Sequence, residues 1–411
     1  MAETTKLDKS TARRIILAAA HGFPAKPGFP RKPPAKLVSA AADIIQQCSW
    51  IQLDTISVVE RAHHHSLWSR LPNWNNSAMA ELYSLTDNSG QRRIFEYWSH
   101  AAALLPSSDL PFAMRRMERI RREGHDWMNT NAETIQAVLS RIRDEGPFSS
   151  RDFEAPEGHK SGWWNWKPAK MALEKLFQAG EILVLRRDGF QKVFDVAERI
   201  LPGISRIQAA DDAAMAAWYV DRAIRELGIF SLKDLSYARN EGIGLVASEI
   251  QNRLEAHRLI EVNLEGGKEK LWLAPEALDA QPPILRGPGR IEILSPFDPF
   301  VINRSRLKRF FDFDFSIECY LPAAKRKFGY FALPLLWLNG QGDGYLAGKI
   351  DLKADRARST LEVRALAWDD MPRDLNPIPR SSTLKKALAA SLGRFADFNQ
   401  CPKIEYRENL E

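Results

Sequence analysis

Apolar residues recur at helical spacing in several stretches of the N-terminal third of the chain. The pattern predicts helices over residues 10–20, 36–47, 61–71 and 109–127, the last of them rich in arginine. A proline-rich connector at 23–34 separates the first two. Residues 50–53, Trp-Ile-Gln-Leu, follow the second helix and predict a short strand.

The middle of the chain predicts one order of elements that is then repeated. It has helices over 131–145, 149–153 and 163–178, followed by a β-hairpin formed by 181–187 and 190–196. An Asp-Gly pair between the two apolar runs is a strong signal for a hairpin turn. Helix, short helix, helix and hairpin is the order of elements in a winged helix.

The same order recurs in residues 211–274. The predicted elements are helices over 211–227, 231–235 and 245–257 and a hairpin of 259–264 and 270–274. The residues match as well, because GPFSSRDF (146–153) aligns with GIFSLKDL (228–235) at an offset of 82 (228 − 146). In both segments a serine is the predicted N-cap of the short helix. This internal repeat predicts tandem winged helices.

The N-terminal region predicts a third, degenerate copy of this unit. Its helix at 36–47 leads directly into the strand at 50–53, as in the two later copies. Gln52 and Asp54 are then expected on a wing strand. Because one residue separates them, strand alternation puts both side chains on one face and Leu53 on the other.

From residue 291 onward the pattern changes to short strands and turns. Strands are predicted at 330–338, 345–353 and 361–368, and a helix at 382–395, which together indicate a small β-barrel or curled sheet closed by a helix. The predicted fold class is therefore α+β. Its four regions are the degenerate copy with the candidate site (1–130), two winged helices (131–202 and 203–285) and the β-barrel with its C-terminal helix (286–411).

The distribution of charge favours a protein that binds nucleic acid. The 411 residues carry 58 Lys and Arg against 52 Asp and Glu, so the net charge of +6 is modest and its distribution matters more. Basic residues cluster at 115–122, 304–309 and 325–327, as expected for phosphate contacts. Any single cluster is more often a solvated helix face. Three of them, with a DNA-binding architecture, favour DNA as the partner.

Cysteine usage and hydropathy indicate a cytoplasmic protein without a membrane segment, and as a DNA-binding protein it is expected to be associated with the nucleoid. Cys48, Cys319 and Cys401 are far apart and form no CxxC pair, which argues against structural zinc or an iron–sulfur cluster and fits a reducing compartment. No run approaches the ~20 apolar residues of a membrane span. The apolar run that follows Arg13-Arg14 is too short for an export signal.

The segment Gln52-Leu53-Asp54 is the candidate for chemistry. A carboxamide and a carboxylate on one strand face can hold one water, which Gln52 orients while Asp54 accepts its proton or stabilises a cationic transition state. Hydrolysis of an N-glycosidic bond needs both functions. An alkylated, cationic base leaves without an acid to protonate it. From the spacing alone, a solvent-facing strand is the commoner explanation.

No other catalytic pattern in the sequence competes with this one. His63, His64 and His65 are consecutive and cannot all face one metal ion, so helix packing or phosphate contact is favoured for them. The sequence has no HExxH motif, no phosphate-binding loop and no defensible Ser/His/Asp order. We therefore expect neither a metal nor a cofactor.

Four long segments of the chain resemble one known family. They are WIQLDTISVVERAHHHSLWSRL (50–71), WWNWKPAKMALEKLFQAGEILVLRRDGFQKVFDVAERILP (163–202), LSPFDPFVINRSRLKRFFDFDFSIECYLPAAKRKFGYFALPLL (294–336) and GKIDLKADR (348–356). The chain resembles the winged-helix DNA glycosylases of the AlkZ/YcaQ type, which remove alkylated bases and unhook interstrand crosslinks. These motifs are long and idiosyncratic, and the match extends over nearly the whole chain.

The resemblance implies a fold, a reaction and a catalytic pair. It implies three winged helices scaffolded by a β-barrel around a C-shaped basic channel for duplex DNA. The catalytic motif is Gln-aliphatic-Gln in one branch of the family and Gln-aliphatic-Asp in the other, and residues 52–54 resemble the second, YcaQ-like branch. That branch is associated with N7-alkylguanine monoadducts and nitrogen-mustard crosslinks. By this likeness Asp54 activates the water or stabilises the cationic transition state, and Gln52 positions the water. The expected protein is a monofunctional, monomeric enzyme of base excision repair.

The resemblance also bears on where the protein contacts DNA. A family β-hairpin probes the groove near the lesion, and the basic stretch 325–328 is our candidate for it. His65 stands where an aliphatic residue is expected. An open channel is expected in place of a deep pocket for a flipped base. The candidate DNA contacts are Arg61, His63, His64, Lys167, Lys170, Arg187, Arg304, Arg306, Lys325, Arg326 and Lys327.

Two other functions compete with a glycosylase. A winged-helix transcriptional regulator without chemistry is favoured by architecture alone. Against it, the wings are tandem within one chain and no separate ligand-sensing or dimerisation segment is evident. A nuclease lacks support because the sequence has no clustered Asp/Glu metal site. The preferred function is therefore a glycosylase acting on double-stranded DNA that carries N7-alkylpurine or crosslink lesions.

Overall fold

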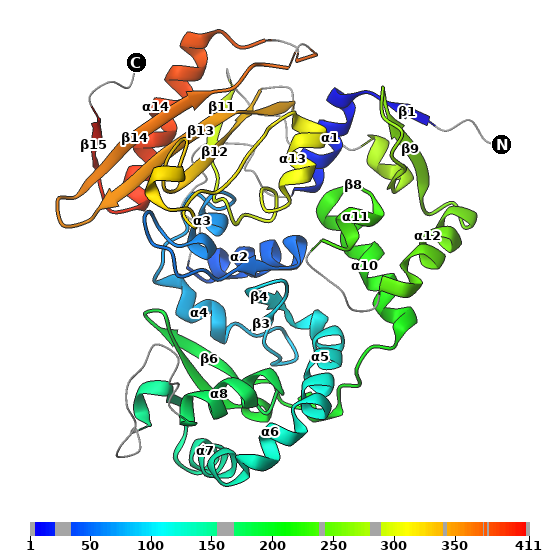
Figure 1. Ribbon diagram of the computed structural model, residues 1–411, viewed down its shortest axis with the longest axis vertical. Helices are drawn as coiled ribbons and strands as arrows, with labels where there is room; N and C mark the ends of the chain where they lie inside the picture. The colour runs from blue at the N-terminus through cyan, green and yellow to red at the C-terminus, as the bar shows by residue number, and fades with distance from the viewer. Residues whose placement is uncertain are drawn as a thin grey trace. The chain divides into compact units, whose positions relative to one another are not determined.

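The chain folds into two compact units, each built from segments distant in the sequence. Unit 1 comprises 1–33, 47–76 and 216–411, and unit 2 comprises 34–46 and 77–215. Figure 1 shows the elements of the computed structural model coloured along the chain. The residues that the structure describes are 5–20, 34–153, 168–237, 243–279, 289–339, 343–372, 374–375 and 378–407. Within these ranges, no helix is long and apolar enough to cross a membrane.

The largest sheet of unit 1 has five strands in the order β11-β12-β13-β14-β15 and forms a half-barrel. Its strands are β11 (Arg290–Ile293), β12 (Ala332–Leu338), β13 (Gly344–Asp355), β14 (Thr360–Trp368) and β15 (Lys403–Tyr406). Neighbouring strands pair antiparallel, except that β15 joins β14 in parallel. The predicted curled sheet is therefore present. Sequence patterning had missed β11 and β15.

Helix α14 (Ser381–Phe398) packs against this sheet next to β11, as predicted for the closing helix. Its Ser391 hydroxyl donates to the carbonyl oxygen of Ile291. Every residue of β12 is buried, which explains why that strand has an unbroken apolar run instead of an alternating pattern.

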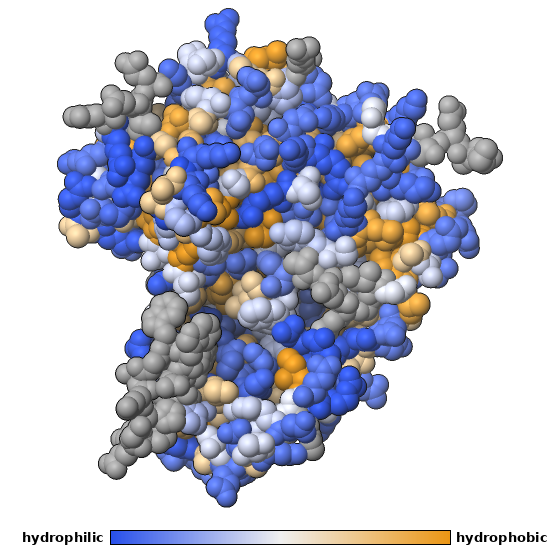
Figure 2. Space-filling view, in the orientation of Figure 1, coloured by the Kyte–Doolittle hydropathy of each residue, from blue (hydrophilic) through white to orange (hydrophobic). Residues whose placement is uncertain are grey.

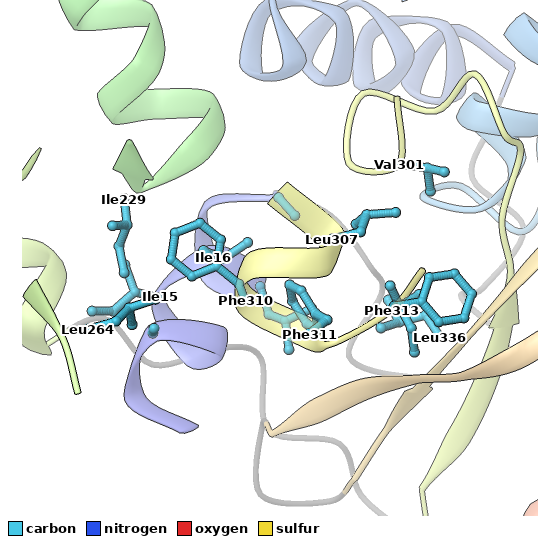
Figure 3. Packing of buried hydrophobic residues seen from close by; sticks show 14 of the residues in the cluster. Ile15, Ile16, Ile229, Leu264, Val301, Leu307, Phe310, Phe311, Phe313 and Leu336 are labelled. Atoms are coloured by element: carbon cyan, nitrogen blue, oxygen red, sulfur yellow. The ribbon is translucent and has the colours of Figure 1, made fainter. Parts of the chain in front are cut away.

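Helices α1 (Lys9–Ala19) and α13 (Arg304–Phe311) pack together in the apolar core of unit 1. Ile15 and Ile16 of α1 lie close to Phe310 of α13 (Figure 3), and these side chains are at most 4% exposed. Burial of each such side chain contributes about 1.5–3 kcal/mol. This packing fixes α13, whose first residue, Arg304, belongs to the candidate site described below.

A second sheet of unit 1 has the strand order β1-β9-β10-β8. Strands β9 (Ile260–Leu264) and β10 (Leu271–Leu273) form the predicted antiparallel hairpin. Strand β1 (Thr5–Leu7) adds in parallel to β9, and β8 (Ile229–Phe230) pairs with β10. Neither β1 nor β8 was predicted, because two or three residues are too few to show a period.

Both predicted copies of the repeated unit have the expected order of elements. The first has α7 (Ala132–Glu145), the 3-10 helix η2 (Ser150–Asp152), α8 (Pro168–Gln178) and the antiparallel hairpin β6 (Ile182–Asp188) with β7 (Gln191–Val196). The second has α10 (Asp212–Leu227), α11 (Leu232–Leu235), α12 (Val246–Glu255) and the hairpin β9 with β10. Each hairpin also receives a short extra strand, β5 (Phe148–Ser149) or β8.

The residues that repeat in sequence also repeat in conformation. Gly146 follows α7 with φ of +109°, and Gly228 follows α10 with φ of +67°, a region that side chains other than glycine rarely adopt. Ser149 and Ser231 then cap the short helices, each in a capping box with the aspartate three residues later. The predicted serine N-caps are confirmed, and these shared caps explain why the two segments align.

Unit 2 also contains elements that sequence patterning partly missed. Its further helices and strands are α4 (Ala78–Ser84), β3 (Ile94–Trp98), β4 (Ala102–Pro106), α5 (Leu110–Glu123) and α6 (His125–Thr130). The hairpin β3-β4 was not predicted, and the single helix expected over 109–127 is divided at Gly124 into α5 and α6. Helix α2 (Pro34–Cys48) then leads the chain from unit 2 back into unit 1.

Candidate active site

The Gln52–Asp54 pair lies where the short strand β2 (Ile51–Gln52) ends. Asp54 had been predicted on that strand, but it lies beyond the strand end, so strand alternation does not orient it. Its Oδ1 accepts the backbone N–H of Ile56 at 2.8 Å, a turn typical of aspartate. The turn still brings the two side chains together, because Gln52 Nε2 donates to Asp54 Oδ2 at 3.2 Å.

This geometry places an orienting amide directly against a carboxylate. Gln52 is only 7% exposed, whereas Asp54 is partly buried. Because the two side chains touch, a water shared by them would lie beside the pair and not between its members. Such a water can donate one hydrogen to the carboxylate and the other to the amide oxygen of Gln52, since both atoms are acceptors.

Two residues that sequence reasoning missed lie within electrostatic reach of Asp54. Burial raises the pKa of the Cys319 thiol, and the Asp54 carboxylate raises it further, while Arg304 and Arg326 lower it. The pKa of Tyr320 is likewise raised, first by partial burial and then by Asp54. Asp54, Arg304 and Arg326, three of the predicted site residues, therefore lie within electrostatic reach of Cys319. The only signal in the sequence was that residues 318–327 fall within one of the family-like segments.

A buried ion pair supports the helix that follows the motif. Arg70, just after α3 (Ala62–Trp68), donates to both oxygens of Asp298 at 2.6 and 2.9 Å. Their side chains are 1% and 0% exposed. Asp298 Oδ1 also accepts the backbone N–H of Phe300 at 2.9 Å, so the carboxylate has several donors. The pair joins residues that are 228 positions apart in the sequence.

The three consecutive histidines are buried in unit 1, with 4%, 8% and 1% of His63, His64 and His65 exposed. Trp74 Nε1 donates to His64 Nδ1 at 3.2 Å, so that nitrogen is an acceptor and the ring is neutral. Burial lowers the pKa of His64 to about 4. The geometry therefore favours helix packing over phosphate contact for His63 and His64, although DNA contact by these residues stays a prediction.

His65 replaces the expected aliphatic residue within an aromatic cluster. Its ring centroid lies 4.9 Å from that of Phe395, and its Nε2 is 2.8 Å from the carbonyl oxygen of Ile293. Burial lowers the pKa of His65 to about 4, although the contact with Ile293 acts in the opposite direction. A neutral imidazole that donates through Nε2 therefore replaces the aliphatic side chain.

The free energy of unfolding should decrease as the pH falls from 6.5 towards 4. The ordinary pKa of His65 is 6.5 and its folded value is about 4, so in this window the unfolded chain binds a proton that the folded protein excludes. This difference in pKa corresponds to a decrease of about 3 kcal/mol in the free energy of unfolding once the pH is below both pKa values. Urea unfolding at pH 7 and pH 4.5 should show His65→Leu with the weaker pH dependence.

His257→Asn is the matched control for this prediction, because His257 is exposed and its φ of +53° suits asparagine. This variant should keep the pH dependence of the wild type. An unchanged pH dependence in His65→Leu would show that His65 does not carry the effect.

Arg187 and Arg306 were predicted to contact DNA, but both lie in buried ion pairs. Arg187 Nη2 is 2.6 Å from Glu96 Oε1, and Arg306 Nη1 is 3.0 Å from Asp234 Oδ2. Arg306 also donates to the carbonyl oxygen of Ile229 at 2.7 Å. Their charges are thus matched within the fold, and the geometry does not favour contact with DNA.

The other predicted DNA contacts have more accessible positions. Lys170, Lys325 and Lys327 are exposed, Arg61, Arg304 and Arg326 are partly exposed, and Lys167 lies outside the described residues. The stretch 325–328, proposed as the groove-probing hairpin, is not a hairpin: it begins at the last residue of the 3-10 helix η6 (Ala323–Lys325) and continues in a loop. The reason is that the backbone N–H groups of Lys327 and Phe328 donate to Glu318 Oε2, each at 2.9 Å, and do not pair with a neighbouring strand.

Comparison with known proteins decides which family this site belongs to. A family model described as DNA glycosylase AlkZ-like matches residues 45–398, a range that includes the Gln52–Asp54 pair. The chain belongs to the AlkZ-like DNA glycosylase family. The resemblance found in the sequence is therefore confirmed.

A solved structure agrees with this assignment at the level of the fold. The chain is similar to the DNA glycosylase AlkZ of Streptomyces sahachiroi, with a TM-score of 0.55 and 14% sequence identity. The alignment covers 98% of this chain and 100% of the other. As an AlkZ-like protein the chain is placed among DNA glycosylases, DNA-binding repair enzymes that hydrolyse bonds between a base and its sugar. This favours the glycosylase over the regulator and the nuclease.

Among the described residues, no group of three or more His, Cys, Asp and Glu side chains is arranged to hold a metal ion. Of the three cysteines, Cys48 is fully buried, and burial raises its pKa to about 11. Cys48 is therefore protonated at neutral pH and unsuited to act as a nucleophile. Within the part of the chain that is described, Gln52 and Asp54 remain the candidate catalytic residues.

Proposed function

We propose that the protein is a monofunctional DNA glycosylase that hydrolyses the N-glycosidic bond of cationic N7-alkylated purines and unhooks interstrand crosslinks of the same chemistry. The observation that carries the proposal is the contact between Gln52 Nε2 and Asp54 Oδ2 at 3.2 Å, inside the segment that matches the AlkZ-like family. An Asp at the third position of this motif supports assignment to the YcaQ-like branch.

The proposed mechanism follows from the charge of the substrate. An N7-alkylated purine is cationic and leaves as a neutral base, so its departure needs no general acid. As the bond from C1′ to N9 breaks, the sugar gains oxocarbenium character, which the carboxylate of Asp54 stabilises. Water held by Asp54 and Gln52 then adds to C1′ and gives its proton to Asp54. The products are the free base and an abasic site.

The architecture and partners predicted from the sequence belong to the same proposal. The order of elements in α7 to β7 and in α10 to β10 supports two winged helices that bind duplex DNA. Arg304 and Arg326, close to the site, support phosphate contacts flanking the lesion. This proposal also includes the four predicted regions, a basic channel for the duplex, a monomeric state and a cytoplasmic, nucleoid-associated location.

The test uses two duplexes, one containing 7-methylguanine and one containing an N7–N7 mustard crosslink. Wild-type protein should release free base from the first and separate the strands of the second, measured by mass spectrometry and denaturing gels. Abasic products should be cleaved only after alkali. An undamaged duplex of the same sequence is the control.

Each part of the proposal has its own contrary result. Absence of base release from both damaged duplexes would contradict the enzyme assignment and favour a DNA-binding regulator. Strand cleavage without alkali would contradict monofunctional hydrolysis, because a monofunctional enzyme leaves the backbone intact. Release from the monoadduct alone would remove crosslinks from the substrate range.

A further inference from the structure

The segment that follows the candidate catalytic pair, residues 55–60, forms neither a helix nor a strand. Asp54 lies at its start, beyond the end of β2, so strand pairing does not fix the position of this carboxylate. Backbone groups outside helices and strands need hydrogen-bond partners elsewhere in the protein. Contacts between the 55–60 segment and distant parts of the fold therefore help to set where Asp54 lies.

One of these contacts comes from a buried asparagine at the end of α14. The backbone N–H of Glu60 donates to Asn399 Oδ1 at 2.7 Å. Asn399 is 0% exposed, although asparagine usually lies at the surface, where Figure 2 shows that hydrophilic side chains dominate the visible face. Buried amides are found where their hydrogen bonds are satisfied. The contact with Glu60 supplies one such bond.

Both ends of the Asn399 amide are hydrogen-bonded, which fixes its orientation. Its Nδ2 donates to the carbonyl oxygen of Phe395, four residues earlier, at 2.7 Å. Only the nitrogen of an amide can donate to a carbonyl oxygen, so Oδ1 points away from Phe395 and towards Glu60. The side chain of Asn399 is therefore an acceptor that is already oriented for one backbone N–H group.

The end of α14 is a rigid support for this acceptor. The backbone N–H of Cys401 donates to the carbonyl oxygen of Ala396 at 2.9 Å, as in the Schellman motif that ends many helices. Phe398 stacks on Trp68 of α3 with ring centres 4.9 Å apart. Helix α3 begins just after the 55–60 segment. The end of α14 thus holds both this segment and the helix that follows it.

Two contacts from the β13–β14 hairpin also hold the 55–60 segment. The carbonyl oxygen of Val58 accepts the backbone N–H of Ala354 at 2.8 Å, and Arg356 Nη2 lies 3.3 Å from Glu60 Oε2. This ion pair is partly exposed to solvent, so it contributes little to stability. The bond to Asn399 involves a fully buried side chain and fixes the backbone of Glu60, so it constrains the path of the chain more strongly.

The strand before the pair is held by different contacts. Arg225 of α10 donates to the hydroxyl of Ser49, which is 0% exposed and has a φ of +59°. This contact lies on the N-terminal side of Gln52, whereas Asn399 acts on the C-terminal side of Asp54. Loss of the Asn399 contact should therefore move Asp54 relative to Gln52.

We propose that Asn399 is a positioning residue for the glycosylase reaction, because its amide holds the 55–60 segment where Asp54 can act together with Gln52. This inference deepens the proposed function and rests on it, since it assumes that Asp54 acts on the glycosidic bond. Asn399 is fully buried and acts only through the segment. A displacement of about 1 Å at a catalytic group can lower a rate about 100-fold.

Two substitutions separate the two hydrogen bonds of the Asn399 amide. Asn399→Asp keeps an oxygen that faces the N–H of Glu60 but loses the amide donor to Phe395. Asn399→Ser can donate its hydroxyl to the carbonyl four residues earlier, but it is too short to reach Glu60. Asn399→Ser should lower the single-turnover rate of base release from 7-methylguanine DNA about 100-fold. Asn399→Asp should stay within a few-fold of the wild type.

Three measurements separate positioning from stability. With enzyme in excess over DNA, the rate constant does not depend on the folded fraction. Affinity for a duplex that carries a tetrahydrofuran analogue of an abasic site should be unchanged in both variants, because Asn399 is 0% exposed. Urea unfolding should show Asn399→Asp to be the less stable variant, since it buries a carboxylate. A purely structural role would therefore make Asn399→Asp the slower enzyme, the reverse of the expected order.

Asn339→Ser is the matched control. Asn339 is 4% exposed, belongs to unit 1, and its Oδ1 accepts the backbone N–H of Asp343 at 2.9 Å. It lies before Gly344, at the opposite end of β13 from Ala354, about 30 Å away along a strand. This variant should be less stable than the wild type and should keep the wild-type rate constant.

Two results would overturn the inference. The first is a wild-type rate constant in Asn399→Ser, because the segment would then keep its position without the bond to Glu60. The second is an equal loss of rate in Asn399→Ser and Asn399→Asp, because an acceptor that faces Glu60 would then have no effect.

Hydrogen exchange distinguishes failure of this inference from failure of the proposed function. The 55–60 peptide should exchange faster in Asn399→Ser than in the wild type, and at the wild-type rate in Asn399→Asp. Base release by the wild type, with unchanged exchange in Asn399→Ser, overturns the inference alone. No base release by the wild type, with the expected exchange, overturns the proposed function and leaves Asn399 as a structural contact of the segment.

Discussion

Asp54→Asn should lower the rate of base release from 7-methylguanine DNA by about 10²–10⁴-fold, the usual contribution of a positioned acid or base. The substitution removes the negative charge that stabilises the oxocarbenium-like sugar, and it removes the acceptor of the water proton. Binding to a duplex with a tetrahydrofuran site should persist, because phosphate contacts supply most of the affinity. Single-turnover release and a binding titration measure the two quantities separately.

The structure allows this substitution without loss of the turn that holds residue 54. The side-chain oxygen of asparagine can still accept the N–H of Ile56, which Asp54 Oδ1 accepts at 2.8 Å, so the turn after β2 is kept. The amide of Gln52 can rotate to present its oxygen to the new amide. A loss of activity therefore cannot be assigned to a collapsed turn if the unfolding midpoint is unchanged.

Asp312→Asn is the matched control for Asp54→Asn. Asp312 is an exposed carboxylate of unit 1 that pairs with Lys9 at 2.6 Å, and its φ of +52° is one that asparagine tolerates well. The control should keep full activity. Turnover by Asp54→Asn within a few-fold of the wild type would show that Asp54 is only a turn residue.

Arg70→Leu should lower the free energy of unfolding by about 3–5 kcal/mol, the usual cost of removing one partner of a buried ion pair. The substitution leaves Asp298 with its charge buried and without the two Arg70 hydrogen bonds of 2.6 and 2.9 Å. Burial opposes the charge of Arg70, but Asp298 outweighs it and holds the pKa of Arg70 above its ordinary value. Urea unfolding measures the loss.

The double variant Arg70→Leu with Asp298→Leu separates loss of the pair from loss of packing. It should recover part of the stability lost by Arg70→Leu, because no uncompensated charge stays buried. Lys270→Ala is the surface control, since Lys270 is 67% exposed in its ion pair with Glu261 and should cost less than about 1 kcal/mol. Equal losses of unfolding free energy in Arg70→Leu and Lys270→Ala would show that the buried Arg70–Asp298 pair contributes no more to stability than an exposed ion pair.

Much of the repeated unit could be predicted because its signals are local. The hairpins β6-β7 and β9-β10 follow from turn residues between apolar runs, and the serine caps follow from the aspartate three residues later. Strands β1 and β15 could not be predicted, because each joins its sheet in parallel with a distant partner. Their own few residues carry no period.

The candidate site shows the same division between local and distant information. Gln52 and Asp54 are close in the sequence, so their contact could be expected even though the strand argument for it was wrong at Asp54. Tyr320 lies far along the chain, and only the fold places it near Asp54. Arg187 and Arg306 resembled DNA contacts in a list of basic residues, but their buried carboxylate partners are visible only in three dimensions.

The segment with the candidate catalytic pair depends on partners that the ribosome makes much later. The backbone N–H of Glu60, a few residues after Asp54, donates to the side chain of Asn399, which is 339 residues later. At about 5–20 residues per second, synthesis of that interval takes roughly 20–70 s. During this time the nascent motif has neither the Asn399 contact nor the Asp298 carboxylate for Arg70. Newly made chains should therefore need chaperone protection until Asn399 has emerged from the ribosome.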